Sequence, residues 1–505
     1  MPVVSTPVRL DPSEFLVNTP ASLDLLDPRL RPLCAAILGA TQVPGASVAV
    51  VMADKGYHFA YGKRFVDTPD PVTLDTGFNI GSCSKAFVSA TLASLVAEGL
   101  CAWDDPISRW VPEFQLHDPQ ITAMATLRDL SANRLGLPGA GLTESGFDPS
   151  YPPEHTFERL KHTPAAFPFR SRFGYVNAGH SANAVAAGRI TGKGVVATIR
   201  ERILAPLGMQ GSSAGSGTPK DLGERAGWHV VLSGKVVAID EVFTDQYTGS
   251  GGMVVSGRDA LQWLRLHLNG GLVDGAQVVP REALLETHLP QAVARPGQDP
   301  MSLFYPRAHM AAYALGWAAS DFEGHPLVMH SGSDLGVQAQ TLLLPKAGIG
   351  VAVYANSIGG GPGALASAFA IAATLLGLAP RDWLAYFQSQ RPKLAPAEAT
   401  MPVPLSLPDL AAYVGSYEHP ADGPLDVSLT AGRLTAVLRK AYRMNFDLIA
   451  LGEHRFAMQF STPEWCGVAA DERLEVSFTV EAGRATRADL PGPFHGRPFL
   501  QMDRP

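Results

Sequence analysis

The sequence predicts an α+β protein in which helices flank an antiparallel sheet, with an all-α subregion and a C-terminal antiparallel β-barrel. A β-branched run at 46–52 and a second short run at 57–62 flank the turn Asp54-Lys55-Gly56, which is typical of a hairpin. Three further apolar runs indicate more antiparallel strands: 327–329, 337–344 and 349–354. Roughly the last 100 residues alternate in strand fashion between Gly and Asp turns, which favours a barrel or sandwich.

Helical segments are expected between these strands. The apolar run 86–100 should end near Gly99, and Thr126 should begin another helix. Three more helices are expected at 181–190, 260–268 and 364–376. The segment 364–379 is too short and too rich in alanine to span a bilayer, so we expect a buried helix there and no membrane partner.

A change in composition divides the chain. Pro392, Pro396, Pro402, Pro404 and Pro408 lie close together, which predicts a stiff linker. The expected organisation is an irregular N-terminal lead-in at 1–29, a main domain at 30–385, the linker at 386–407 and a separate β domain at 408–505.

The composition is that of a globular chain with ample apolar material for a core. Of 505 residues, 46% are hydrophobic and 17% are charged, and the net charge is −7 without a basic block. We therefore expect no nucleic-acid partner. The four cysteines are widely spaced and lack a Cys-x-x-Cys, which favours free thiols in a reducing compartment. No basic region followed by an apolar core opens the sequence, so we expect no secretory signal and a cytoplasmic location.

The first candidate for chemistry is the Ser-x-x-Lys motif formed by Ser82 and Lys85 at the start of a helical run. Residues three apart lie on one face of a helix, so the Ser82 hydroxyl and the Lys85 amine come within hydrogen-bonding reach. Free N–H groups and the positive dipole end favour negative charge at a helix start. Such a serine can be deprotonated by a neighbouring base, and its N–H can hold an oxyanion. The alternative is a helix-capping serine beside an exposed lysine.

Two further motifs follow in the chain. Tyr175 and Asn177 are two apart, so on an extended segment both side chains point to one side, where the phenol can relay a proton and the amide can bind a substrate carbonyl. His330 and Gly332 end an apolar strand, and the glycine lets a substrate backbone approach closely. Each pair alone could occur by chance. Together, and in this order along the chain, the three motifs predict one site with a nucleophile, a base and groups that hold the substrate.

With these motifs the chain resembles the serine β-lactamase and penicillin-binding-protein superfamily, whose signature combines Ser-x-x-Lys with two further motifs. It is most similar to the class C-like branch of esterases, D-aminopeptidases and transesterases. Other segments that carry the resemblance are 43–50, 78–82, 104–107, 127–130, 206–209, 251–256 and 315–317. The resemblance covers roughly residues 30–380, and the segment 413–417 resembles the lipocalin-like barrel attached to some members.

The resemblance implies roles for the motif residues. Ser82 would be the acylated nucleophile, and Lys85 with Tyr175 would form the proton-transfer pair. Asn177 would bind substrate. The backbone N–H groups of Ser82 and Ser333 would form the oxyanion hole.

Two positions depart from that family. His330 stands where many members carry the lysine of Lys-Thr-Gly, which helps hold a substrate carboxylate, and this weakens the case for a β-lactamase or a transpeptidase. We expect His330 to act as a neutral catalytic donor, with Gly332 beside the substrate, because two cations near Ser82 would be mutually destabilising. The segment 131–137 also differs from the usual Leu-Ser-His-Arg-Ser-Gly-Leu.

The expected function is a serine hydrolase that forms an acyl-enzyme on Ser82 and cleaves an amide, peptide or ester bond of a small molecule or peptide, with no cofactor and no metal. An acyltransferase or transesterase that passes the acyl group to an amine or alcohol is the alternative within this chemistry. A non-catalytic binding or assembly scaffold is the alternative of another class, and a homo-oligomer is left open. Ser84 ranks below Ser82 because no lysine follows it three residues on, and Gly179–Asn183 lacks the last glycine of a Gly-x-Ser-x-Gly elbow.

Overall fold

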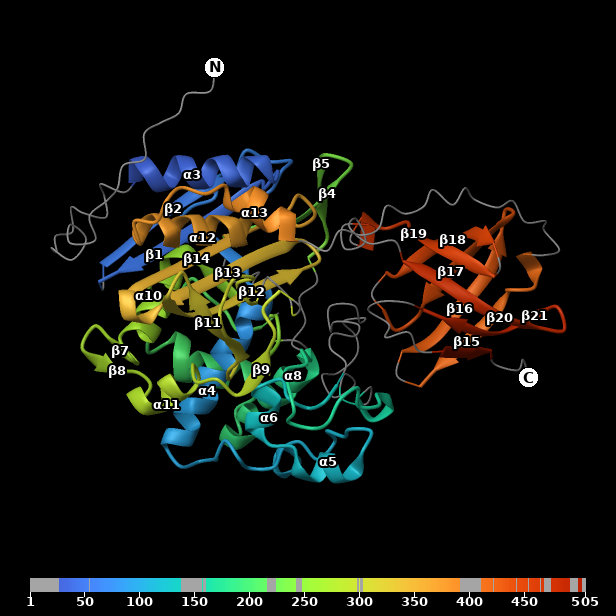
Figure 1. The fold of residues 1–505 in the computed structure, drawn as a ribbon, viewed down its shortest axis with the longest axis horizontal. Helices are drawn as coiled ribbons and strands as arrows, with labels where there is room; N and C mark the ends of the chain where they lie inside the picture. Colours follow the sequence, from blue (N-terminus) through green and yellow to red (C-terminus); the bar gives the residue numbers. More distant parts are fainter. Residues whose placement is uncertain are drawn as a thin grey trace, which may run out of the picture.

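The computed structural model shows a larger body built of a sheet and helices, with a β-barrel beside it (Figure 1). It describes residues 27–53, 55–137, 157, 160–215, 224–241, 248–297, 299, 303–390, 410–420, 422–441, 443–452, 454–463, 465–466, 474–490 and 498–501.

The larger body is organised around an antiparallel sheet, which has eight strands among the described residues. In spatial order these are β2 (Lys55–Gly62), β1 (Gly45–Met52), β14 (Ile349–Ala355), β13 (Val337–Leu344), β12 (His325–Asp334), β11 (Ala318–Phe322), β10 (Ala311–Tyr313) and β9 (Ala292–Ala294). The predicted hairpin is β1–β2, and the three predicted apolar runs are β12, β13 and β14. The antiparallel sheet predicted from the sequence is therefore confirmed.

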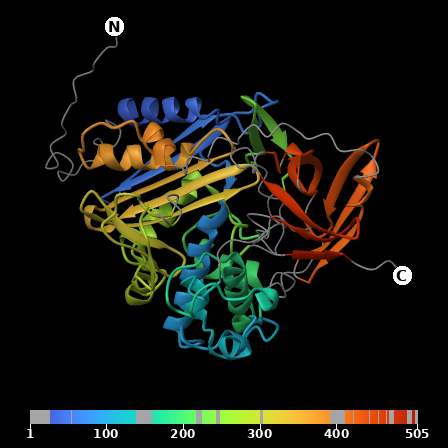
Figure 2. The same cartoon turned by 45° about the vertical axis from the view of Figure 1, so that its right-hand side comes forward.

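Both faces of this sheet are buried, and each contributes to its own apolar core. Along β1, Val48 and Val50 belong to one core while Ala49 and Val51 belong to the other, as the two-residue period of a strand requires. The first face is covered by α3 (Asp27–Ala40), α12 (Gly363–Leu375) and α13 (Trp383–Gln390). The opposite face packs on α10 (Gly257–Leu268) and lies over the helical region, so Figure 2 shows the sheet between two helical layers.

The all-α subregion lies on that opposite side of the sheet (Figure 1). Its helices are α4 (Ser84–Ala97), α5 (Pro119–Met124), α6 (Leu127–Ser131), α8 (Asn177–Thr191), α9 (Val195–Ile199) and α11 (Arg281–Glu286), with short turns η2 (Ile107–Arg109) and η4 (Leu160–His162) and the π-helical segment η5 (Arg200–Leu204). Gly99 follows the end of α4 with a positive φ of 73°, as expected for a terminating glycine. Thr126 caps α6 through a reciprocal capping box with Asp129.

Short strand pairs complete the larger body. They are β3 (Gly77–Asn79) with β6 (Val254–Ser256), β4 (Trp228–Leu232) with β5 (Lys235–Ile239), and β7 (Leu272–Val273) with β8 (Ala276–Gln277). Between β13 and β14 the chain turns through the 3-10 segment η7 (Pro345–Ala347).

The C-terminal part is a closed antiparallel barrel, as predicted. Its strands follow the chain in order: β15 (Gly415–His419), β16 (Gly423–Thr430), β17 (Arg433–Leu438), β18 (Asn445–Gly452), β19 (Arg455–Phe460), β20 (Glu475–Glu481), β21 (Arg484–Asp489) and β22 (Pro498–Gln501). Pairing of Tyr417 with Gln501 and of Glu418 with Leu500 closes it. The interior is an apolar core with an aromatic group formed by Tyr413, Phe456 and Phe478.

Some expected boundaries differ from the structure. Helix α13 continues to Gln390 and so occupies the first residues of the expected linker 386–407, because Trp383 and Phe387 are buried against the sheet's helical cover. The rest of that linker lies outside the described residues. Helix α3 starts at Asp27, inside the expected lead-in 1–29.

Two other expectations concern chemistry and membranes. All four cysteines are free thiols, as expected from their spacing. In the part of the chain that the structure describes, no helix combines the length and the apolar character needed to cross a bilayer.

Candidate active site

Ser82 lies in a short 3-10 turn, η1 (Gly81–Cys83), which leads directly into α4. The turn is fixed by Asn79, whose Oδ1 accepts the Gly81 N–H at 2.9 Å and whose amide donates to the Gly251 carbonyl. Gly81 has a φ of 47°, a left-handed conformation that favours glycine. The sequence places Ser82 at a helix start, and in the structure its half-buried side chain lies on the tight turn before that helix.

The Lys85 amine donates a hydrogen bond to Ser82 Oγ at 2.8 Å. It also donates to the Ser250 carbonyl at 2.7 Å and lies 4.8 Å from the centre of the Tyr175 ring. The Lys85 side chain is fully buried, so the alternative of an exposed lysine beside a capping serine does not describe this pair. A buried amine held on the serine hydroxyl has the geometry of a nucleophile and its base.

Tyr175 lies beside Lys85, but the backbone from Tyr175 to Asn177 differs from the one expected. Val176 is extended, with φ −138° and ψ 112°, but Asn177 is already the first residue of α8. The expectation of one extended segment is therefore wrong, because the helix begins four residues before its alanine-rich part. Tyr175 is half-buried, and the buried Oδ1 of Asn177 has no hydrogen-bond partner among the described residues.

His330 lies in β12 with its side chain fully buried. Its Nδ1 is 2.6 Å from the Ser331 carbonyl, which can only accept, so Nδ1 carries the proton. Its Nε2 is 2.8 Å from the Tyr313 hydroxyl, which then donates to it. Burial, with the positive charge of a protonated Lys85 as the second cause, lowers the pKa of His330 to about 3. The imidazole is therefore neutral near pH 7, and both of its nitrogens are engaged within the protein.

Gly332 brings β12 into contact with the turn that carries Ser82. A Cβ at Gly332 would lie 1.9 Å from the Ile80 carbonyl oxygen, and one at Gly81 would lie 2.7 Å from the Ser333 backbone nitrogen. The space beside Gly332 is thus filled by protein backbone, which gives this glycine a packing role, while its expected contact with substrate stays a prediction. The backbone around Ser82 and Ser333 is adjacent across this contact.

Several residues of the site carried no signal in the sequence. Tyr313, which binds His330, is fully buried and belongs to the short strand β10, whose Ala-Ala-Tyr sequence has no strand signature. Ser250 binds Lys85 through its carbonyl, and any residue type could do so. His180 is buried in α8, and burial, with Lys85 next, lowers its pKa well below the usual value.

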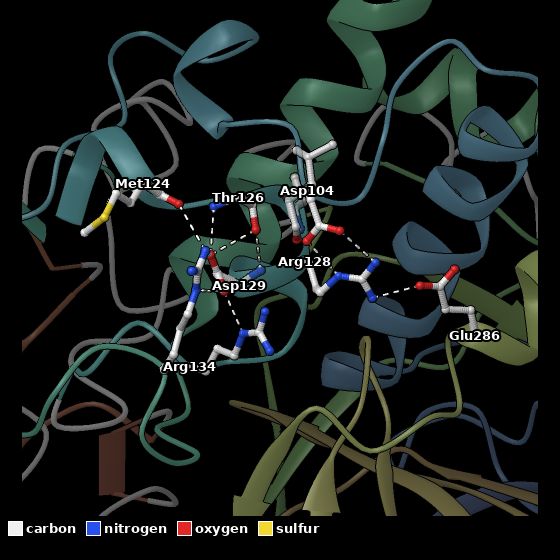
Figure 3. A network of polar contacts seen from close by, with 10 residues as sticks. Asp104, Met124, Thr126, Arg128, Asp129, Arg134 and Glu286 are labelled. Carbon is white, nitrogen blue, oxygen red and sulfur yellow. Dashed lines mark hydrogen bonds and ion pairs between the residues drawn. The ribbon is translucent and has the colours of Figure 1, made fainter. Parts of the chain in front are cut away.

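A charged network holds the helical side of the site together. The Asp129 carboxylate is buried and accepts from Arg134 Nε at 2.6 Å, from Arg170 Nη2 at 2.7 Å and from the Thr126 backbone N–H at 3.0 Å. Figure 3 shows Arg134 and Thr126 directed toward Asp129. Desolvation by itself would raise the pKa of Asp129, but the hydrogen bonds from Arg170 and Arg134 outweigh it and lower the pKa. Beside it, Arg128 bridges the carboxylates of Asp104 and Glu286 (Figure 3).

The competing serines have structural partners. Ser84 Oγ donates to the Gly81 carbonyl at 2.6 Å and accepts the Met253 N–H, so it stabilises the turn around Ser82. Ser181 lies inside α8 and donates to Ser250 Oγ at 3.2 Å. Within the described ranges, no three His, Cys, Asp or Glu residues are grouped so that they could hold a metal ion.

Comparison with known proteins gives family matches over both parts of the chain. The Beta-lactamase family model matches residues 30–376, and a domain of unknown function, DUF3471, matches residues 401–503. The unguisins hydrolase ungD of Aspergillus violaceofuscus is 26% identical over 79% of this chain and 76% of its own length. Protein flp of Staphylococcus aureus is 25% identical over 62% of this chain and 60% of its own length.

Solved structures with the same fold extend over nearly the whole chain. The octameric penicillin-binding protein homologue from Pyrococcus abyssi superposes with a TM-score of 0.61 and 21% identity, over 92% of this chain and 97% of that one. SurE superposes with a TM-score of 0.57 and 20% identity, over 95% of this chain and 100% of that one.

Proposed function

This chain belongs to the beta-lactamase family, and from that premise we propose that it is a serine hydrolase that forms an acyl-enzyme on Ser82. Its substrate is a small molecule or peptide with an amide, peptide or ester bond. The observation that supports this most strongly is the 2.8 Å hydrogen bond between Lys85 Nζ and Ser82 Oγ. The family implies a serine hydrolase or an acyl-transfer enzyme. Our proposal adds that Ser82 is the nucleophile, that an amine or alcohol is the leaving group and that water is the acceptor.

Acylation begins when Lys85, as the neutral amine, takes the proton of Ser82 Oγ while that oxygen attacks the substrate carbonyl. The carbonyl oxygen becomes an oxyanion, and the N–H groups of Ser82 and Ser333 stabilise it. The proton then passes from Lys85 through the Tyr175 hydroxyl to the leaving amine or alcohol, and the bond to that group breaks. A water molecule attacks the resulting ester by the same route in reverse, which releases the acid and restores Ser82.

Asn177 and His330 hold the substrate side of this arrangement in different ways. Asn177 is proposed to bind a substrate carbonyl through its side-chain amide N–H, because its Oδ1 is buried and shielded from a substrate. His330 acts indirectly, because Ser331 and Tyr313 occupy its ring nitrogens. In this proposal His330 holds β12 in place beside the oxyanion site. Because its imidazole is neutral, it offers no cation there, and a substrate needs no carboxylate to bind next to it.

Acyl transfer to an amine or alcohol uses the same acyl-enzyme and differs only in the acceptor. We favour water because two relatives that match over three quarters or more of both chains are named hydrolases of unguisins. A non-catalytic scaffold is disfavoured by the buried Lys85, since a buried amine without a catalytic use would be a costly feature to retain.

The proposal is tested by labelling with a fluorophosphonate, followed by intact-mass measurement and peptide mapping. We expect a single adduct on Ser82 and none with Ser82→Ala. The matched control is Ser89→Ala, the same change on α4, the helix that follows Ser82, at a buried hydroxyl without a hydrogen-bond partner in the described structure. That variant should label at the wild-type rate. An adduct on Ser84 or Ser181 would show that the nucleophile is wrongly assigned.

A further inference from the structure

Asn133 follows the end of α6 in an unusual backbone conformation. Its φ is 51°, in the left-handed region that asparagine adopts more readily than most other side chains. It is almost completely buried, with 1% of its surface exposed. In this conformation its carbonyl and its side chain both reach the segment that carries Tyr175.

Asn133 accepts two hydrogen bonds, one from each residue that flanks Tyr175. The N–H of Gly174 donates to the Asn133 carbonyl at 2.8 Å, and the N–H of Val176 donates to Asn133 Oδ1 at 2.8 Å. Gly174 and Val176 are the residues directly before and after Tyr175. One residue therefore fixes the backbone on both sides of the phenol that lies under the Lys85 amine.

The same side chain makes a third contact that fixes its own orientation. Because Oδ1 accepts from Val176, the amide nitrogen faces the other way, where it lies 3.3 Å from His180 Nε2. An amide NH₂ only donates, so His180 accepts through Nε2. Asn133 thus joins the end of α6, the Tyr175 backbone and the first turns of α8.

The charged network described above supports Asn133 from behind. Arg134, the next residue, binds the buried Asp129 carboxylate, and its carbonyl accepts the Arg170 N–H at 2.9 Å. Arg170 also binds Asp129 through its side chain. The segments 129–134 and 170–176 are therefore held together by charge at one end and by Asn133 at the other, close to the reacting groups.

We propose that Asn133 is a positioning residue that sets the place of the Tyr175 hydroxyl relative to Lys85 and the leaving group. This inference rests on the proposed function, in which Tyr175 passes the proton to the leaving group. Losing the side-chain bond frees the backbone after Tyr175, and a displacement of about 1 Å at a reacting group can cost roughly 100-fold in rate. The loss should fall on kcat with little change in KM, because Tyr175 acts in the chemical step.

The experiment compares Asn133→Gly with Asn133→Ala in the full-length protein. Both remove the bond to Val176, but glycine accepts the left-handed backbone while alanine is strained there by about 1 kcal/mol. Both should lower kcat for an unactivated ester, whose leaving alkoxide needs the proton from Tyr175, by roughly 10- to 100-fold with little change in KM, and only the alanine variant should show an added loss in Tm. Asn133→Asp, which keeps an acceptor oxygen for Val176, should recover most of the rate.

A double-mutant cycle separates positioning from a general loss of stability. In a Tyr175→Phe background, Asn133→Gly should lower kcat for this ester by less than about 3-fold, because the group that it positions is gone. The control is Asn356→Ala, another buried asparagine that binds backbone groups, at Gly45, Lys63 and Arg64. If Asn356→Ala lowers the rate, its fold-loss and that of Tyr175→Phe should multiply in the double variant.

The outcomes distinguish this inference from the proposed function. A wild-type kcat in Asn133→Gly, or a loss that multiplies fully with that of Tyr175→Phe, would overturn the role of Asn133 alone. Failure of Ser82 to label with a fluorophosphonate, or a Tyr175→Phe variant with wild-type kcat, would overturn the proposed function, and this inference with it.

Discussion

At the scale of single residues, Lys85 is fully buried, and its amine contacts Ser82, Ser250 and Tyr175. We expect Lys85→Met, which keeps most of the buried volume, and Tyr175→Phe each to lower kcat by about 10³-fold or more, with the fold retained. In the proposed mechanism the two act on one proton, so the double variant should be little worse than the poorer single variant. Steady-state kinetics, with circular dichroism as the control for folding, measures this, and losses that multiply would indicate independent roles.

The lowered pKa of His330 should make the stability of the fold depend on pH. Its pKa is lowered from 6.5 to about 3 by burial, so the folded protein keeps it neutral where the unfolded chain is protonated. The unfolded state therefore binds more protons between these values, and the free energy of unfolding falls as pH drops from about 6.5 toward 3. His330→Gln, which removes the titrating group, should show a shallower fall in urea midpoint over this interval. Equal slopes for the two proteins would contradict a neutral, buried His330.

The same residue predicts a preference among substrates. With both ring nitrogens bound to Tyr313 and Ser331, His330 offers no cation to a carboxylate. Matched neutral and carboxylate-bearing esters should therefore give pH profiles of kcat/KM with the same shape above about pH 5, and the neutral ester should be preferred. His330→Lys serves as the comparison that introduces a cation. Carboxylate-dependent turnover of a penicillin by the wild type would show that this position is misread.

At the scale of elements, the Asp129 carboxylate ties α6 to the segment before Tyr175. Its pKa lies below the ordinary value of 3.8 because Arg170 and Arg134 outweigh the desolvation. Its contribution to stability is therefore complete above that value and is lost as pH falls through the lower, folded pKa. Asp129→Asn should lower the free energy of unfolding by about 3 kcal/mol near pH 7, since it leaves two arginines without their charge partner. Chemical denaturation at pH 7 and pH 3 should show the difference shrinking in acid.

The elements also mark where sequence reasoning succeeds and where it stops. Hairpins and capped helices depend on neighbours in the chain, so β1–β2 and the Thr126 cap were predictable. Helix α8 begins at Asn177 although Ser181 resembles a better start, and it packs against α6, a tertiary contact that the local sequence does not show. Strand β10 consists of Ala311–Tyr313 and exists through its pairing with β9 and β11. The contact of Tyr313 with His330 therefore could not be predicted from the local sequence pattern.

At the scale of the whole molecule, the apolar core of the barrel shares no residue with the two cores of the larger body within the described ranges. An ion pair between Arg443 and Asp240 joins the two parts, but both side chains are about half-exposed or more, so it adds little stability. We expect a chain ending at Gln390 to fold and to label at Ser82, as followed by thermal unfolding and fluorophosphonate adduct mass. Loss of the cooperative transition would show that the larger body depends on the barrel.

The contact between Gly332 and the Ile80 carbonyl has a consequence for the order in which the protein folds. Ser82 and Lys85 belong to a turn and helix near the start of the chain, whereas Ser333 arrives on β12 far along it. Closing so long a loop is slow, because its entropic cost must be met before the contact between these segments can stabilise the chain. The helices can thus be complete, and Lys85 can already contact Ser82, while the backbone N–H groups of Ser82 and Ser333, the proposed oxyanion donors, are still apart. We therefore expect the ability of Ser82 to react to return late in refolding, together with the docking of the sheet and after the growth of the helices.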